Sequence, residues 1–387
     1  HIYNSGFGDL LLWGIDELLT YHYLIAEVFR VSPMPYEKFW SLTKREQADL
    51  IWKKLFIERS PVSEACRGVI TCISELGLDP AERKLDNIRG FFRGMKIEDY
   101  IDLVFEKAVV REVIMTNDPF DASERKAWEG KMKRDKRFRS ALRIDRLLVD
   151  WEHACDDLAS WGYDVEKRLG EWTLSEIRRF LADWAREMKP AYMAASLPAG
   201  FTFPDDSPCS RIIEDCIMPS GKELGLPFAL MIGVKRQVNP DLKIAGDSVG
   251  KSPISSLENL LKKYPDNKFL VTMLSRENQH ELCVTARKFP NLMIFGCWWF
   301  LNNPSIIEEM TRERMELLGF SMIPQHSDAR VLDQLIYKWK HSRKVISKVL
   351  VEKYTDLLDT GWKISREEVK RDVELLFGGI FEEFAGK

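Results

Sequence analysis

Short β-forming runs alternate with helix-like stretches after residue 108, and this alternation restricts the fold more than any other feature of the chain. The strand-like runs cover 109–116, 138–143, 191–196, 227–234, 268–273, 291–297 and 320–325. The helix-like stretches cover 173–188, 206–224, 253–263, 276–288, 305–318, 329–356 and 366–383. Repeated strand-then-helix units predict parallel strands. An eighth strand before residue 1 would complete a distorted (β/α)8 TIM barrel of the α/β class, although a doubly wound open sheet has the same local pattern.

The first third of the chain is predicted to be helical. From 14 to 30 the apolar residues Ile15, Leu18, Leu19, Ala26 and Phe29 follow a helical spacing. Further helices are expected at about 44–57, 61–76, 80–95 and 97–107. We therefore expect one domain over 1–387, in which 14–107 is a helical insertion after the first strand.

The composition excludes several classes of protein. Of 387 residues, 45% are hydrophobic and 30% are charged, which is typical of a globular protein with a large core. A net charge of -3 argues against a nucleic-acid or acidic-membrane partner. No apolar run approaches the roughly 20 residues that span a bilayer. The seven cysteines form no C-x-x-C pair, which favours reduced thiols and a cytoplasmic location.

A carboxylate and a guanidinium stand two residues apart after the last predicted strand. Asp328 and Arg330 lie where the strand at 320–325 passes into the helix at 329–356. Such strand ends carry the active sites of α/β proteins. Asp328 could simply cap the helix. Arg330 would face the positive end of the helix dipole at a cost of about 0.3–1 kcal/mol, which predicts an anionic partner for it.

Other strand ends also carry polar or aromatic side chains. Trp298 and Trp299 would point to opposite faces if the strand at 291–297 continued through them, so that one belongs to the core and the other to a polar site. Basic residues at several strand ends, among them Arg143, Arg236 and Arg276, predict an anionic substrate such as a carboxylate or phosphate.

His22 lies on the apolar face of its helix, where a lone histidine is usually a buried core residue. Its neighbour Tyr23 strengthens a functional interpretation, because histidine and tyrosine suit acid–base chemistry.

Five motifs together resemble the uronate isomerase family of the amidohydrolase superfamily. They are the strand ends at 298–300 and 327–330, the segment 337–343, the run 116–121 and the helix containing 21–23. The resemblance extends over the whole chain. It implies interconversion of D-glucuronate with D-fructuronate and of D-galacturonate with D-tagaturonate, with a sugar acid as the substrate and a homo-oligomer as the assembly.

The resemblance also implies a divalent metal, with zinc as the expected ion. Its ligands would be a His-x-His pair at the end of strand one and the aspartate of strand eight. His1 matches the second histidine and Asp328 matches the aspartate, whereas the first histidine would lie two residues before residue 1. Many members have a further histidine at the end of strand five, and Ile232 occupies the matching position.

The same resemblance implies a role for each candidate residue. The metal would hold the C6 carboxylate and C5 hydroxyl of the substrate, and Arg143 and Arg330 would contact the substrate. Trp298 or Trp299 would line the pocket. Tyr23, with its pKa lowered by Arg330, is the expected C2 base. Asp328 would accept the C5 hydroxyl proton, and His22 would help to open the sugar ring.

Two alternatives remain at this point. A metal-dependent hydrolase on the same barrel usually has a strand-five histidine ligand, so Ile232 argues against it. A barrel that binds a sugar acid without converting it would be favoured if the first histidine were missing.

Overall fold

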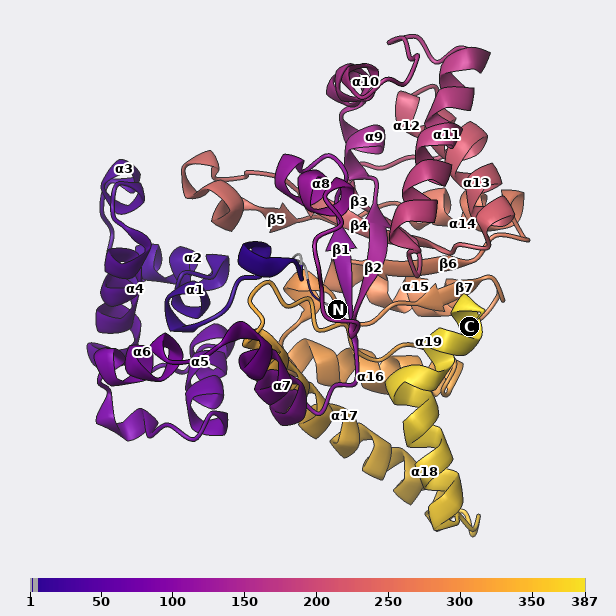
Figure 1. Ribbon diagram of the computed structural model, residues 1–387. Coiled ribbons are helices and arrows are strands. Elements are labelled where there is room, and N and C mark those ends of the chain that lie inside the picture. Colours follow the sequence, from indigo (N-terminus) through magenta and orange to yellow (C-terminus); the bar gives the residue numbers. More distant parts are fainter. Residues whose placement is uncertain (1, 3–5, 387) are drawn as a thin grey trace.

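The computed structural model describes residues 2 and 6–386, and its centre is a seven-stranded sheet (Figure 1). The strands are β1 (Val113–Asn117), β2 (Phe138–Arg143), β3 (Met193–Pro198), β4 (Phe228–Lys235), β5 (Ser248–Val249), β6 (Phe269–Met273) and β7 (Leu292–Ile294). Their order is β1-β2-β3-β4-β6-β7, all neighbours in this path being parallel, while β5 pairs antiparallel with β4. The alternation of strands and helices therefore predicted the parallel sheet correctly.

Short bridges connect the two edges of this sheet. Ile2 forms parallel bridges with Met115 of β1 and with Ala329, and Phe295 after β7 forms one with Ile323. The segment 323–329 and Ile2 thus lie between β7 and β1 and close the sheet into a distorted barrel. The open doubly wound sheet is excluded by this closure.

Helices surround the barrel and bury the outer face of its strands. They are α8 (Ala122–Glu129), α9 (Asp145–Val149), α10 (Trp151–Ser160), α11 (Glu171–Met188), α12 (Pro208–Ile212), α13 (Met218–Leu224), α14 (Ile254–Lys263), α15 (Gln279–Ala286), α16 (Pro304–Leu318), α17 (Gln334–Asp359), α18 (Arg366–Glu374) and α19 (Ile380–Ala385). In β4, Leu230 and Ile232 pack in the outer core, whereas Ala229 and Met231 belong to the cluster inside the barrel. This alternation follows from the period of two along a strand.

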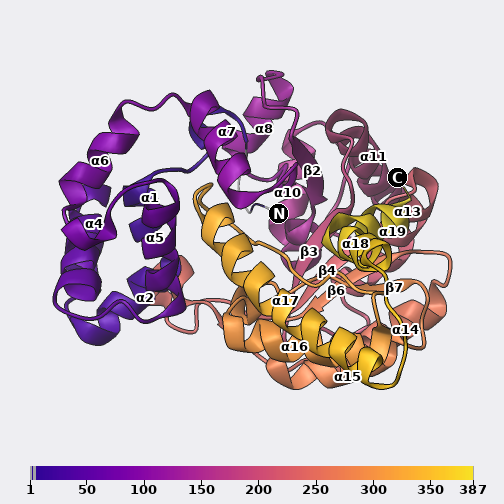
Figure 2. The same cartoon turned by 90° about the horizontal axis from the view of Figure 1, so that it is seen from below.

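The N-terminal helices form a layer beside the barrel (Figures 1 and 2). They are α1 (Ile15–Leu19), α2 (His22–Val31), α3 (Tyr36–Trp40), α4 (Lys44–Trp52), α5 (Glu64–Glu75), α6 (Leu85–Arg93) and α7 (Ile97–Ala108). Their apolar side chains share one core cluster with Val113 and Met115 of β1 and with Leu335 of α17. The predicted helical insertion is confirmed, and it packs directly against the barrel.

Three predicted elements differ from the structure. The helix expected at 14–30 is broken between α1 and α2, because Tyr21 has an extended backbone with ψ 141°. The run 320–325 forms only the bridge at Ile323, and α17 begins at Gln334 rather than at 329. Asp328 and Arg330 therefore precede the helix, so the interpretation of Asp328 as a cap and the unfavourable dipole contact of Arg330 were wrong.

Within residues 2 and 6–386, no helix is long and apolar enough to cross a bilayer. The seven cysteines are free thiols, as their spacing predicted.

Candidate active site

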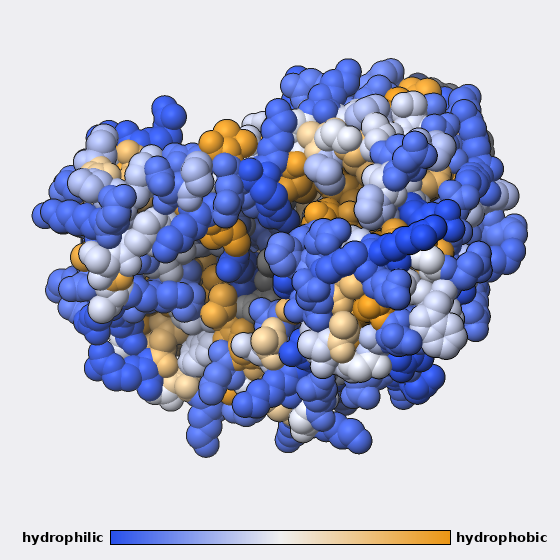
Figure 3. All heavy atoms as spheres, turned by 90° about the horizontal axis from the view of Figure 1, so that it is seen from above, coloured by the Kyte–Doolittle hydropathy of each residue, from blue (hydrophilic) through white to orange (hydrophobic). Residues whose placement is uncertain are grey.

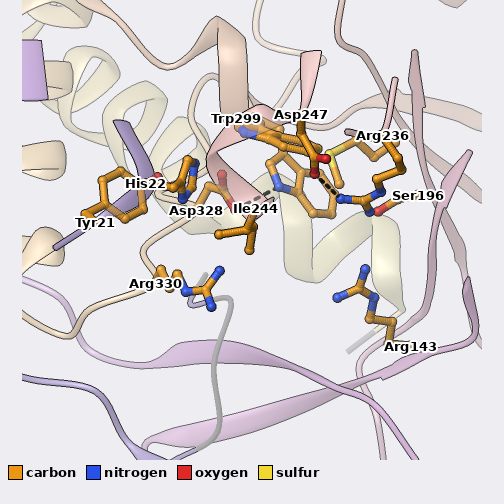
Figure 4. Close-up of a pocket in the computed structure, with 12 residues that line it drawn as sticks. Tyr21, His22, Arg143, Ser196, Arg236, Ile244, Asp247, Trp299, Asp328 and Arg330 are labelled. Atoms are coloured by element: carbon orange, nitrogen blue, oxygen red, sulfur yellow. Dashed lines mark hydrogen bonds and ion pairs between the residues drawn. The ribbon is translucent and has the colours of Figure 1, made fainter. Parts of the chain in front are cut away.

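A pocket opens at the carboxyl ends of the barrel strands, next to the helical insertion. It encloses about 450 Å³ between atoms, its open mouth included. Its lining residues are Tyr21, His22, Arg143, Ser196, Met231, Arg236, Ile244, Asp247, Trp298, Trp299, Asp328 and Arg330 (Figure 4). The surface is hollowed between the insertion and the barrel, and hydrophobic side chains lie on the walls of the hollow (Figure 3).

Asp328 is the carboxylate at one end of this pocket, and its side chain is buried. Oδ1 of Asp328 accepts a hydrogen bond of 2.8 Å from Nε1 of Trp298. Nζ of Lys338 donates to the backbone carbonyl of the same residue at 2.7 Å. Burial raises the pKa of the Asp328 carboxyl, although Lys338 and the indole N–H act in the opposite direction. Asp328 also has φ +45°, a left-handed conformation that costs free energy outside glycine.

Two arginines on opposite strand ends give the pocket positive charge. Arg143 is the last residue of β2, and its Nε and Nη2 donate to the two carboxylate oxygens of Asp145 at 2.7 and 2.9 Å. Oδ1 of Asp145 also accepts from the backbone N–H of Ser196 at 3.0 Å, which fixes the pair against β3. Arg330 lies near Tyr21, Glu17 and Asp328; its burial lowers the pKa of the guanidinium, and those neighbours raise it. Both guanidinium groups remain charged at neutral pH.

His22 provides a neutral imidazole. Its two ring nitrogens are buried and have no hydrogen-bond partner among the described residues, although the residue as a whole is only half-buried. Burial, together with the positive charges of Arg330 and Lys338, holds the pKa of His22 well below its usual value. A neutral imidazole with unpaired nitrogens is the form that can accept a proton.

The chain is similar to solved structures over its full length. It is 57% identical to a uronate isomerase from Bacillus halodurans C-125, with a TM-score of 0.98, covering 100% of this chain and 92% of that one. The chain belongs to the uronate isomerase family. It is an isomerase, and the hydrolase and the non-catalytic barrel are not favoured.

Two more distant structures share the fold. The uronate isomerase of Thermotoga maritima is 15% identical with a TM-score of 0.78, and covers 96% of this chain and 90% of that one. The glucuronate isomerase of Caulobacter crescentus is 13% identical with a TM-score of 0.75, and covers 97% of this chain and 87% of that one. No family model and no curated protein matches the chain.

The structure of this uronate isomerase brings together most of the residues that the sequence indicated. Asp328, Arg330, His22, Arg143, Trp298 and Trp299 all line the one pocket. Their catalytic and binding roles remain predictions. His1, the predicted metal ligand, lies outside the described residues. Within those residues, no group of three or more His, Cys, Asp and Glu side chains could hold a metal ion.

The two tryptophans depart from the prediction. Because β7 ends at Ile294, the alternation of a strand does not extend to Trp298 and Trp299. Gly296 turns the chain with φ +69°, and a Cβ there would lie 2.6 Å from the backbone nitrogen of His326. Both indoles are buried and both line the pocket, so neither is only a core residue.

Tyr23 has a different environment from the one predicted. It does not line the pocket, and burial together with Tyr21 and Asp328 raises its pKa well above the usual value. The expectation that Arg330 lowers the pKa of Tyr23 was wrong. Arg330 acts instead on Tyr21, where its effect is smaller than that of burial.

On β4, which corresponds to strand five of the barrel, the side chain that faces the pocket is one residue away from the position indicated by the sequence. Ile232 packs in the outer core, whereas Met231 lines the pocket. Met231 is therefore the β4 side chain that faces the site. Its thioether is only a weak acceptor and does not replace a histidine.

Sequence reasoning missed several lining residues, namely Tyr21, Ser196, Ile244 and Asp247, and assigned no specific role to Arg236. The sequence indicated Arg236 only as one of several basic residues at the ends of predicted strands. Ser196 lies on β3, in the predicted strand at 191–196. Tyr21 reaches the pocket through the break before α2, and Ile244 and Asp247 reach it through the loop after β4, so these three carry no local signal.

Proposed function

We propose that this uronate isomerase interconverts D-glucuronate with D-fructuronate and D-galacturonate with D-tagaturonate. The observation that supports these substrates is the charge of the pocket, which is lined by the guanidinium groups of Arg143, Arg236 and Arg330 and by the carboxylates of Asp247 and Asp328. A sugar acid offers a carboxylate to the cations and several hydroxyl groups to the remaining acceptors and donors.

Arg143 and Arg330 are proposed to bind the substrate. Asp145 holds the guanidinium of Arg143 in one orientation by two hydrogen bonds, so little side-chain entropy is lost when a ligand binds. Trp298 and Trp299 wall the pocket and exclude water from the reacting carbons.

A divalent metal, with zinc as the expected ion, is the proposed cofactor. Asp328 fits a ligand position, because burial raises its pKa and a nearby cation would stabilise its charged form. His1 is the second proposed ligand. When bound, such an ion acts as a Lewis acid toward carboxylate and hydroxyl oxygens.

Aldose–ketose isomerisation moves one proton from C2 to C1 and a second from the C2 hydroxyl to the C1 oxygen. The enediolate formed between the two steps needs groups that stabilise its negative charge. Tyr23 keeps its proton because its pKa is raised, so it suits the role of a donor better than that of the predicted base. His22 is proposed to carry the proton from C2 to C1, because it lines the pocket and its ring nitrogens have no hydrogen-bond partner among the described residues. Arg330 is proposed to stabilise the negative charge of the enediolate, and Asp328 is proposed to accept the C5 hydroxyl proton.

The test is an NMR experiment in D₂O with the zinc-loaded protein and D-glucuronate. We expect formation of the ketose, loss of activity in Asp328→Asn, and a larger loss in His22→Asn than in Tyr23→Phe. No conversion by the parent protein with bound metal would overturn the proposed substrates. A larger loss of C2 exchange in Tyr23→Phe would restore tyrosine as the base.

The cytoplasmic location and the homo-oligomeric state belong to the same proposal. Sedimentation of the purified protein tests the oligomeric state, with a mass above the monomer's 45.0 kDa expected.

A further inference from the structure

The loop after β4 forms a hairpin that extends over the pocket. β5 returns antiparallel to β4 by pairing Val249 with Val234, so the segment 236–247 projects from the barrel as one unit. Arg236, Ile244 and Asp247 of this segment all line the pocket (Figure 4).

The hairpin is held against the helical insertion at its far end. Nε1 of Trp40 donates to the backbone carbonyl of Asp241 at 2.8 Å, and Nδ2 of Asn239 donates to the hydroxyl of Tyr36 at 3.0 Å. Nζ of Lys243 lies 4.4 Å from the ring centroid of Trp40. The barrel therefore supports the segment at its base and the insertion supports it at its far end.

Arg236 and Asp247 form an ion pair at the wall of the pocket. Nη1 of Arg236 lies 2.6 Å from Oδ2 of Asp247. The Asp247 side chain is only 4% exposed, whereas that of Arg236 is 52% exposed. The guanidinium also lies 5.4 Å from the ring centroid of Trp299, so an indole face and a carboxylate together fix its position.

This pair offers both kinds of hydrogen-bonding group to a ligand. Arginine has five N–H donors, and a carboxylate has about four acceptor sites. Oδ1 of Asp247 already accepts from the backbone N–H of Gln237 at 2.9 Å, and Oδ2 from Arg236 at 2.6 Å. A sugar hydroxyl both donates and accepts, so adjacent donors and acceptors are the complement of one or two such groups.

The pair lies away from the groups proposed for the chemistry. In Figure 4, His22, Asp328 and Arg330 lie on one side of the pocket, and Arg236 lies on the other. A six-carbon chain with its reacting end beside His22 would present hydroxyl groups in the direction of the hairpin.

We propose that Arg236 and Asp247 bind hydroxyl groups of the sugar acid and thereby determine which uronate is preferred. This inference rests on the proposed substrates, which differ from each other in the configuration of one hydroxyl group. The ion pair is held in place before binding, so it can discriminate by geometry rather than by closure.

The test compares kcat and KM for D-glucuronate and D-galacturonate in the zinc-loaded parent, Arg236→Gln, Arg236→Lys and Asp247→Asn. We expect KM to rise about tenfold or more in Arg236→Gln, with kcat within about threefold of the parent. The ratio of kcat/KM between the two uronates should change by about fivefold or more in at least one variant. Arg236→Lys should recover part of the lost affinity.

Lys235→Gln is the matched control. Lys235 is the neighbouring residue, is exposed and does not line the pocket, so its loss removes the same charge without a proposed contact. Its KM and substrate ratio should equal those of the parent.

Unchanged KM and an unchanged substrate ratio in both Arg236→Gln and Asp247→Asn would overturn the proposal while the proposed function stands. An equal fall of kcat for both uronates without a change in KM would also overturn it, because a structural role alone explains that result. A parent that converts neither uronate would refute the proposed substrates, and this inference with them.

Discussion

The indole Nε1 of Trp298 donates a 2.8 Å hydrogen bond to Oδ1 of Asp328, and the two residues come from neighbouring strand ends of the barrel. The indole also stacks on the ring of His326 with centroids 4.2 Å apart and an angle of 17° between the rings. The tryptophan is therefore fixed by stacking, and it orients a carboxylate proposed to hold metal and to accept a proton. Trp299 lines the same pocket, yet its Nε1 has no hydrogen-bond partner among the described residues.

Replacing Trp298 with phenylalanine should weaken catalysis far more than the same change at Trp299. A hydrogen bond to a charged group contributes about 1.5–3 kcal/mol, which corresponds to a roughly 10- to 100-fold loss in kcat/KM for Trp298→Phe. Trp299→Phe keeps an aromatic face and loses no hydrogen bond within the described structure. Steady-state kinetics and zinc content of both variants provide the check. Equal losses in the two variants would show that the indole N–H of Trp298 does not matter.

Replacing Asp145 with asparagine should raise KM through Arg143. The substitution removes the charge that holds the guanidinium by two hydrogen bonds, and it leaves a mostly buried cation without its carboxylate. We expect KM to rise about tenfold and the free energy of unfolding to fall by about 1–3 kcal/mol. Asp266→Asn is the control, because its ion pair with Lys222 is exposed and such pairs contribute about 0–1 kcal/mol. A parent-like KM in Asp145→Asn would exclude Arg143 as a residue that Asp145 positions for binding.

The stability of the protein should depend on pH through Asp118. Burial, and then the charge of Asp145, raises the pKa of Asp118 to about 7. An aspartate in the unfolded chain titrates near 3.9, so between these values the folded state binds more protons than the unfolded state. The stabilising contribution is thus fully present below about pH 4 and is lost as the pH rises through about 7.

Asp118→Asn should therefore be more stabilising at pH 8 than at pH 5, by about 2–3 kcal/mol. The asparagine oxygen can still accept the 2.9 Å hydrogen bond from the backbone N–H of Phe120. Denaturant unfolding at the two pH values measures the difference, with the exposed Asp206→Asn as a control that should show none. A gain that is equal at both pH values would mean that Asp118 is ionised in the folded protein across this range.

The strand ends explain why much of the site could be predicted from the sequence. Asp328, Arg143 and Trp298 each follow a strand-like run, and parallel strands bring their carboxyl ends to one side of a barrel. The order of the sheet follows from the same alternation. These inferences depend on patterns of neighbouring residues, and the tertiary contacts of the folded protein do not change them.

The remaining part of the site depends on contacts between distant segments. Tyr21 reaches the pocket because the predicted helix at 14–30 breaks before α2, and the apolar spacing of that segment gives no sign of the break. Asp247 reaches it because the hairpin after β4 is supported by Trp40, some two hundred residues earlier in the chain. The raised pKa of Tyr23 is likewise a result of burial in the folded protein, which periodicity alone does not reveal.

The junction between the insertion and the barrel should depend on the hydroxyl of Tyr100. Asp333 lies just before α17 and is fully buried; its Oδ1 accepts from the Tyr100 hydroxyl at 2.5 Å and its Oδ2 from the backbone N–H of Gly14 at 2.9 Å. Tyr100→Phe removes one donor from a buried carboxylate. The free energy of unfolding should fall by about 1–3 kcal/mol, as measured by denaturant titration at pH 7.

Tyr192→Phe is the matched control for this prediction. Tyr192 is as fully buried as Tyr100, but its hydroxyl has no hydrogen-bond partner among the described residues. Removing a buried hydroxyl of that kind should leave stability unchanged or raise it slightly, because an unsatisfied polar group is costly to bury. Since Asp333 lies three residues from Arg330, Tyr100→Phe should also lower kcat, whereas Tyr192→Phe should not. Equal stability in the two variants would show that the carboxylate of Asp333 is satisfied without Tyr100 and that the junction is held by its apolar core.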